Sequence, residues 1–587
     1  MRSLWKYMEG RKLFAALMIL VGAGNAAAQT GGWLIVQNAI NKGIAVYNKK
    51  GALVGNVHHL TIAVVVYLAV AAVGWVLQAR LIKGLATIGQ AVVIGLRRDL
   101  FDHLTSLSLR YFSQQKAGWI IARLTSDVDA VSDVLSQGMP TLVSNAILLP
   151  AAVTGLLLVD WRLGLLSFAV LPPALILSRW FQRVSHAANV EQRNRIAAIT
   201  AQIAESVAGM AVVQAFNRER RFQAEFDELN AANRAQATYV QRIFSVFFPS
   251  IEFLGVVAMG AVLYLGAHLF AHHTIQIGTL FVAVYLLQLV FQPLQELSDV
   301  YGQLQSASAA MVKIASILDE ESEIQDRPDV QPLPRLEGDL DIDSVVFAYG
   351  KEDVLHGVSF HIEPGGCFAL VGESGHGKST LARLIGRHYD PREGAIRVDG
   401  HDLRDVELRS YRRQLGVVLQ DPFLFSGTIA SNIRFAKPDA TDEEVAAAAA
   451  AVGVDRVAAR LSGGLDHAVR EGGAGLSAGE RQLISIARAL LADPRILVLD
   501  EATSNIDRPT EVLIELALDR LLKGRTSIII AHRLSTVRRA DEILVVENGQ
   551  VVQRGPQDDL LAQDGPFRRL AHTLEGGEPD LARARAG

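Results

Sequence analysis

The sequence predicts a membrane protein in two parts, a six-helix, all-α transmembrane domain followed by an α/β domain. Three observations lead to this fold class. The chain has 587 residues, which is too long for one ordinary domain. Hydrophobic residues make up 50% of it, and the long apolar runs gather in residues 1–300. In the second half, short β-type runs alternate with helical patterns, as they do around a mostly parallel sheet.

The first apolar stretch, residues 13–36, fits two interpretations. Basic residues precede "LFAALMILVGAGNAAAQ", a pattern that also fits a cleaved secretory signal peptide. Apolarity resumes at Trp33, however, so the stretch reaches the ~20 residues that a membrane span needs. We therefore expect a retained first transmembrane helix.

Six stretches in total are long and apolar enough to cross a bilayer. They lie at about 13–36, 58–80, 140–159, 163–183, 250–271 and 277–298. Two connections are short, at 160–162 and 272–276, whereas residues 81–139 and 184–249 are long, polar and helix-forming. The helices are therefore expected to continue far beyond the membrane on one side.

Positive charge is unequal on the two sides of these spans. Seven Lys or Arg fall between Arg80 and Arg123 and nine between Arg179 and Arg242, whereas the loops on the opposite side hold four. The positive-inside rule then places both termini and both long hairpins in the cytoplasm.

Each long hairpin has a distinctive tip, at residues 113–122 and 211–217. In both, a short apolar cluster beside a glycine is flanked by charge, as expected of a helical turn that docks on another domain. A solvated helical hairpin is the alternative interpretation.

Residues 316–337 are acidic and proline-bearing, which indicates a linker between two domains. The transmembrane domain is accordingly predicted at 1–315 and the α/β domain at 338–572. The last residues, 573–587, hold too few apolar side chains to pack and are expected to form a flexible tail.

The stretch "GESGHGKST" (372–380) fits the pattern G-x-x-x-x-G-K-[ST] between an apolar strand and a helix. Gly375 and Gly377 allow the backbone to curl so that successive N–H groups point inward to a phosphate. Lys378 would reach the outer phosphates, and the Ser379 hydroxyl can ligate Mg²⁺. The side chain of His376 is expected to point away from the phosphates. The motif predicts a nucleotide-binding P-loop.

A second element, "RILVLDEATS" (495–504), places two acids at the carboxyl end of a buried strand, where α/β sheets bind ligands. Asp500 would hold Mg²⁺, and Glu501 could accept a proton from attacking water. An exposed loop acid is the alternative for Glu501. His532 directly follows another strand, "SIII", and is expected to contact the terminal phosphate, although a lone histidine is often structural.

Several motifs then occur in a distinctive order. They are Walker A (372–379), Gln420 in "VVLQDPFLF", "LSAGE" (476–480), Walker B with Glu501, "SNID" (504–507) and "AHRLS" (531–535). Together with six preceding spans, they make the chain resemble a half-transporter of the ATP-binding cassette (ABC) exporter family over nearly its whole length. The implied fold is an ABC exporter-type transmembrane domain followed by a P-loop ABC ATPase domain.

The resemblance implies that two nucleotide domains meet head to tail, each ATP lying between one chain's P-loop and its partner's signature. Here the signature would be Leu476, Ser477, Ala478, Gly479 and Glu480, acting on the partner's ATP. Asp507 would lie at the dimer interface. The coupling helices of the family match residues 113–122 and 211–217.

The same resemblance assigns the remaining site residues. Glu501 and His532 would be catalytic, and Mg²⁺ would be held by Ser379, Gln420 and Asp500. Tyr349 would stack on adenine. The full set expected to bind ATP is Tyr349, Gly372, Glu373, Ser374, Gly375, His376, Gly377, Lys378, Ser379, Thr380, Gln420 and Asp500.

The signature departs from the family's usual LSGGQ at two positions. Ala478 adds only a methyl group where the backbone faces the phosphate, so little loss is expected. Glu480 brings a carboxylate near a triphosphate, and the repulsion would cost on the order of 1 kcal/mol after screening. Both a homodimer and a heterodimer with a different half-transporter remain open.

We therefore predict a multi-pass subunit of the bacterial inner membrane, an ATPase or translocase that uses ATP and Mg²⁺ to export a lipophilic or amphipathic molecule. Its partners would be a second half-transporter, the lipid bilayer and a transported small molecule, lipid or peptide. A net charge of −4 gives no indication of a nucleic-acid partner, and the single Cys367 excludes an internal disulfide. Three alternatives are a soluble cassette ATPase acting on DNA or ribosomes, a nucleotide-gated channel or regulator, and an importer of a siderophore-like substrate.

Overall fold

The computed structural model describes residues 6–7, 12–44, 55–169, 171–328, 330–500, 508–531 and 534–574. It divides into two compact units, the first made of residues 1–105 and 117–320 and the second of residues 106–116 and 321–587. Glu501, Asp507, His532 and most of the predicted tail lie outside the described residues.

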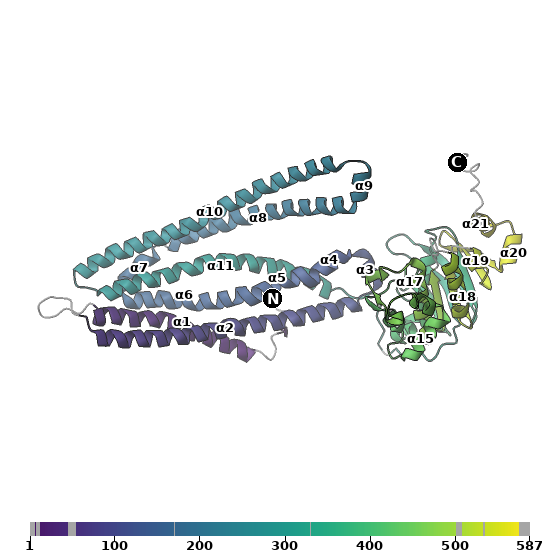
Figure 1. Cartoon of the computed structure of the whole chain (residues 1–587), viewed down its shortest axis with the longest axis horizontal. Helices are drawn as coiled ribbons and strands as arrows, with labels where there is room; N and C mark the ends of the chain where they lie inside the picture. Colours follow the sequence, from purple (N-terminus) through teal and green to yellow (C-terminus); the bar gives the residue numbers. More distant parts are fainter. Residues whose placement is uncertain are drawn as a thin grey trace. The chain divides into compact units, whose positions relative to one another are not determined.

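The first unit is helical (Figure 1). Its long helices are α1 (Lys12–Ala39), α2 (Val57–Ser106), α6 (Met139–Val159), α8 (Leu171–Ala208), α10 (Glu219–Ala271) and α11 (Ile277–Leu318). Shorter ones are α4 (Ala117–Ala122), α5 (Val128–Asp133), α7 (Trp161–Phe168) and α9 (Met210–Ala215), with π-helical turns at Ile40–Ile44, Arg123–Asp127 and Val134–Gly138. Helices α8 and α10 form a long hairpin with α9 at its tip, which falls on the second predicted coupling segment.

Five helical stretches in the described residues are long and apolar enough to cross a membrane. They are Lys12–Ile44, Val57–Ser106, Ala117–Val159, Trp161–Ala208 and Glu219–Ala271, which contain the first five predicted spans. In α11 the apolar segment found is Ile277–Val290, which is shorter, so the sixth span stays a prediction.

Polar side chains inside the predicted spans join one helix to another. Asn145 on α6 donates a hydrogen bond of 2.9 Å to Glu296 on α11, and the amide of Asn25 on α1 donates one of 2.5 Å to Gln78 on α2. Both asparagines are buried. Such bonds satisfy polar groups that hydrocarbon cannot.

The second unit is built on a six-stranded sheet in the order β12-β11-β3-β10-β9-β6. Its strands are β3 (Cys367–Val371), β6 (Leu415–Val418), β9 (Ile496–Asp500), β10 (Thr526–Ile530), β11 (Glu542–Glu547) and β12 (Gln550–Gly555). All neighbours pair in parallel except β11 and β12. The carboxyl ends of the parallel strands therefore meet at one edge.

An antiparallel sheet of order β2-β1-β4-β5 completes the core. It consists of β1 (Leu340–Phe347), β2 (Leu355–Ile362), β4 (Glu393–Val398) and β5 (His401–Asp402), and a third, two-stranded sheet pairs β7 (Gly427–Thr428) with β8 (Ala468–Val469). The helices of this unit are α3 (Leu109–Gln114), α12 (Lys378–Ile385), α13 (Leu408–Arg412), α14 (Ile429–Arg434), α15 (Asp442–Ala451), α16 (Val454–Ala458), α17 (Ala478–Leu491), α18 (Arg508–Leu522), α19 (Leu534–Val537), α20 (Gln557–Ala562) and α21 (Pro566–Leu574).

The second half of the predicted linker is fixed to this unit. The backbone N–H groups of Leu333 and Leu336 donate to Ser410 and Gln414, at 2.9 and 2.8 Å. The fully buried Arg387 donates to the carbonyl of Gln325, at 3.4 Å. Residues after 320 are therefore packed as part of the second unit, although their composition is typical of a linker.

We predict a pH-dependent stability from His388, just after α12. Burial, and then the charges of Arg412 and Arg383, lower the pKa of His388 to about 4. The unfolded chain takes up this proton near pH 6.5, whereas the folded chain does not, so stability falls as the pH drops from 6.5 to 4. The effect should reach roughly 3 kcal/mol at full protonation.

The check is the unfolding midpoint of the full chain between pH 4 and 7. His388→Gln should flatten the pH dependence of that midpoint, and His401→Gln, at an exposed histidine of the same unit, should not. Equal slopes in the wild type and the His388 variant would show that this histidine makes no such contribution.

Candidate nucleotide site

The loop between β3 and α12 depends on its glycines. Gly372, Gly375 and Gly377 have φ values of +150°, +90° and +100°, which side chains rarely adopt. A Cβ on Gly377 would lie 2.7 Å from Leu355, and one on Gly372 would collide with the carbonyl of Val546. The loop therefore curls tightly at the end of a buried strand, which leaves its N–H groups and the start of α12 to face an anion.

The side chain of Lys378 folds back on this loop. Its ammonium group donates to the carbonyls of Gly372 and Glu373, at 2.7 and 2.8 Å, and the residue is only 5% exposed. Burial lowers the pKa of Lys378, and the negative charges of Asp500 and Glu373 act against that shift. The structure thus brings a positive charge from the P-loop close to the Walker B acid.

Tyr349 is held from several sides. Its ring meets Phe347 and Tyr389 edge to face, at 4.9 and 5.2 Å between centroids. Its hydroxyl donates to Thr380 at 3.3 Å and accepts from Arg383 at 3.1 Å, both on α12. An aromatic face fixed beside the P-loop helix is a suitable platform for a base.

Arg110 on α3 also holds Tyr349. Its guanidinium donates to the carbonyl of Tyr349 at 2.6 Å and to both carboxylate oxygens of Glu323, at 2.9 and 3.0 Å. The segment 106–116, which overlaps the first predicted coupling segment, therefore contacts the backbone of the expected adenine platform within one unit. The sequence offered no sign of this contact, because 239 residues separate its partners.

Asp500 lies where the central strands end. It is the last residue of β9 and pairs in register with Ile530 of β10, which in turn pairs with Leu370 of β3. Asp500, Ala531 and the P-loop therefore meet at one edge of the sheet. Glu501 and His532 come next in the chain, but both lie outside the described residues, so their roles stay predictions.

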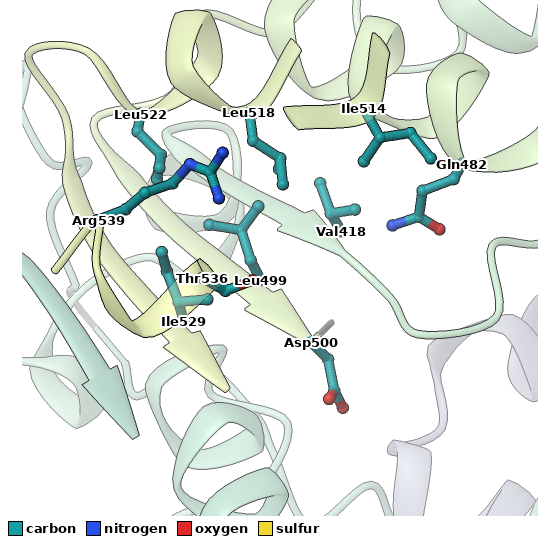
Figure 2. Close-up of a pocket in the computed structure, with 10 residues that line it drawn as sticks. All are labelled: Val418, Gln482, Leu499, Asp500, Ile514, Leu518, Leu522, Ile529, Thr536 and Arg539. Carbon is teal, nitrogen blue, oxygen red and sulfur yellow. The ribbon is translucent and has the colours of Figure 1, made fainter. Parts of the chain in front are cut away.

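A narrow cavity of about 20 Å³ lies behind Asp500, with room for roughly one water molecule (Figure 2). Apolar side chains of β6, β9, β10 and α18 line it, among them Val418, Leu499 and Ile514. Asp500 points away from these side chains, beyond the end of β9. The cavity is too small for a nucleotide, so it belongs to the core that positions the strand end.

The predicted signature begins helix α17 with a capping box. The Ser477 hydroxyl accepts from the N–H of Glu480 at 3.2 Å, and the Glu480 carboxylate accepts from the N–H of Ser477 at 2.8 Å. The second oxygen of Glu480 accepts from Arg460, at 3.3 Å. The repulsion expected from Glu480 is therefore offset by a cation 20 residues away in the chain.

The expected magnesium ligands differ in setting. Ser379 is exposed in the first turn of α12, Asp500 ends β9, and Gln420 is exposed just after β6. A hydroxyl, an amide and a carboxylate offer the oxygen atoms that Mg²⁺ prefers, with water completing its shell. Within the described residues there is no group of three or more His, Cys, Asp or Glu that could hold a metal.

Comparisons with known proteins agree with this geometry. Residues 17–294 match the family described as the ABC transporter transmembrane region, and residues 355–504 match the family described as ABC transporter. The chain belongs to the ABC transporter family. The P-loop, Gln420, the signature and Asp500 fall inside the second match, and this ABC domain binds ATP.

Curated relatives cover most of the chain. A fatty acid ABC transporter ATP-binding/permease protein of Mycobacterium tuberculosis is 36% identical over 513 residues, which span 87% of this chain and 80% of the relative. An ATP-dependent lipid A-core flippase of Syntrophus aciditrophicus is 35% identical over 488 residues, with 83% and 81% covered. An uncharacterized ABC transporter ATP-binding protein of Bacillus subtilis, YfiC, is 34% identical, with 97% and 93% covered.

One solved structure matches this chain over nearly its whole length. The solved structure of a bacterial Atm1-family ABC exporter with ATP bound is similar with a TM-score of 0.78 and 27% identity, over 98% of this chain and 99% of that one. The predicted family and fold class, a helical transmembrane domain followed by an α/β ABC domain, are therefore confirmed.

We predict that Tyr349→Ala weakens ATP binding about tenfold, because stacking on a base contributes roughly 1–3 kcal/mol. Tyr349→Phe keeps the ring and loses the bonds to Thr380 and Arg383, so its affinity should stay within about threefold of wild type. Equilibrium binding of a fluorescent ATP analogue without Mg²⁺ measures both. If alanine and phenylalanine weaken binding equally, the hydroxyl and not the ring makes the contact.

Proposed function

We propose that this chain is an ATP-driven half-transporter that works as a dimer and exports a lipophilic or amphipathic molecule from a bacterial inner membrane. One observation carries the proposal. The second unit contains a P-loop closed by its own Lys378 and, separately, a capped helix start at Ser477 that also offers N–H groups to an anion. Two phosphate-seeking elements in one chain are explained if the second serves a partner's ATP.

In the proposed chemistry, the residues at this edge of the sheet have separate roles. Lys378 and the loop N–H groups would bind the outer phosphates, and Ser379, Asp500 and Gln420 would hold Mg²⁺, which stabilises the charge that develops on the phosphates. Glu501 would accept a proton from the attacking water, and His532 would contact the terminal phosphate. The signature Leu476–Glu480 of the partner would complete the site, with Asp507 at the interface.

Exposed apolar surfaces in the two units support docking between copies. At the tip of the α8–α10 hairpin, Val212 and Phe216 are 61% and 71% exposed. On the second unit, Phe423 and Phe425, just after Gln420, form an exposed aromatic cluster with Phe435, which follows α14; Phe425 stacks on Phe435 at 4.7 Å. We propose that the tip of one chain docks on such a cluster of the other, so that nucleotide state reaches the membrane helices.

The names of two relatives support a lipid-like substrate, since one handles fatty acid and the other lipid A-core. Both termini and the ABC domain would face the cytoplasm, as the charge of the long connections indicates. Alternating access would follow from closure of the nucleotide domains on ATP and their release after hydrolysis.

The deciding experiment is ATPase activity of the chain purified alone in lipid nanodiscs, with Glu501→Gln as the control. We expect turnover that the substitution reduces at least about a hundredfold. Folded protein that binds ATP without turnover would exclude an active homodimer and point to a different partner chain. Ion conductance without turnover would favour a nucleotide-gated channel.

A double-mutant cycle tests how the signature tolerates its carboxylate. Arg460→Ala leaves Glu480 uncompensated beside the partner's phosphates, so the KM for ATP should rise about three- to fivefold, the size expected of an ion pair whose arginine is exposed. Glu480→Gln should be near wild type.

When Glu480→Gln is already present, adding the Arg460 substitution should have no effect. Arg456→Ala, at an exposed arginine of the neighbouring helix α16, is the matched control and should leave KM unchanged. Additive effects of the Arg460 and Glu480 substitutions would show that the pair does not act on the phosphate.

A further inference from the structure

Helices α8 and α11 of the first unit line an open cavity of about 290 Å³, at the small end of the range for ligand pockets. Its α8 wall runs from Phe181 to Arg193, which is roughly 18 Å of helix at 1.5 Å per residue. The α11 wall runs from Tyr301 to Ala309. The cavity is therefore elongated along the helices.

The charge of the lining has one sign. None of the lining residues is Asp or Glu, whereas His186 and Arg193 stand two helical turns apart on one face of α8. Within the described residues Arg193 forms no ion pair, although Arg195 is paired with Glu191 at 2.7 Å. A cation whose charge the protein leaves uncompensated in a pocket favours an anionic ligand.

The opposite end of the cavity is apolar and firmly held. Phe181 stacks on Phe247 at 3.9 Å and meets Phe244 edge to face at 5.2 Å, so the α8–α10 core fixes its ring. Tyr301 on α11 also lines the cavity and is 55% exposed. An apolar chain would contact these rings, whereas the head of the ligand would lie near Arg193.

The aromatic end and the Arg193 end of the cavity lie in the order expected from the membrane boundary on α8. The apolar run of α8 ends at Arg179 and Arg183 with Trp180 between them, and Arg and Trp are the residue types that mark the membrane–water interface. Phe181 therefore lies at the interface and Arg193 on its cytoplasmic side. This order matches a lipid-like molecule with its tail toward the bilayer and its head toward the cytoplasm.

We propose that this cavity binds an amphipathic anion, a carboxylate or phosphate headgroup with an apolar tail, as the transported substrate. The proposal rests on the proposed transport function, whose substrate class it names. Arg193 binds the head, and Phe181 and Tyr301 contact the tail. A cationic amphiphile finds no carboxylate in the lining, and a small inorganic anion gains nothing from the aromatic end.

The test uses the full chain in lipid nanodiscs and three probes of equal chain length, dodecanoate, dodecanol and dodecylamine, with inorganic phosphate as the anion without a tail. We measure saturable binding of radiolabelled dodecanoate without ATP and, in parallel, stimulation of ATPase activity by each probe. Dodecanoate should bind and stimulate at the lowest concentration, and phosphate should not compete with it.

Two variants should weaken dodecanoate selectively. Arg193→Gln should weaken its binding about tenfold, as for the loss of a charge-assisted bond, without changing the response to dodecanol. Gly302→Leu should block the cavity, because a Cβ at Gly302 meets no atom within 4 Å and a larger side chain would extend into the space.

Each variant has a matched control. Arg195→Gln removes the same charge from the same helix outside the cavity, and Gly260→Leu fills an equally open position on α10. Both should bind dodecanoate like the wild type.

Several results would overturn the proposal. They are no saturable dodecanoate binding by the wild type, equal binding of dodecylamine, or equal effects of the Arg193 and Arg195 substitutions. Selective binding in a chain without ATPase activity would instead keep the site and contradict the transport cycle.

Discussion

The meeting of the P-loop with Asp500 depends on the register of three parallel strands. Because β3, β10 and β9 pair in step, Leu370, Ile530 and Asp500 stand side by side, and the chain leaves all three strands at the same edge. The P-loop can then curl over that edge only because Gly372 passes against the carbonyl of Val546, where a side chain cannot fit. Apolar packing between the sheet and α18 keeps the strand ends in place.

Local patterns were enough to predict much of this protein. A P-loop is a short stretch between a strand and a helix, and a membrane span is a continuous apolar run, so both are visible within about 10 to 25 residues of sequence. The spacing of Ser477 and Glu480 also fits a capping box, which sequence reasoning could have used to see that the carboxylate was engaged. We instead expected repulsion from a carboxylate without a partner in its own chain.

Contacts between distant residues could not be predicted in this way. Arg110 with Tyr349, and Arg460 with Glu480, are arginines whose partners follow no periodic pattern. The proline-bearing, acidic stretch after residue 320 has the composition of a free linker, yet Arg387 and the backbone bonds of Leu333 and Leu336 fix it to the sheet domain. The composition of a segment shows which of its own side chains can pack, but it does not show which distant residues will form hydrogen bonds with it.

The segment 106–116 gives the protein an unusual connectivity. The chain passes between the two units three times, at 105/106, 116/117 and 320/321. The ATP-binding part is therefore a discontinuous domain, and a fragment that starts at the linker would hold Glu323 and Tyr349 without the Arg110 that bonds to both. Exchange of ATP-binding parts between related half-transporters would then have to carry this short piece of the membrane part along with it.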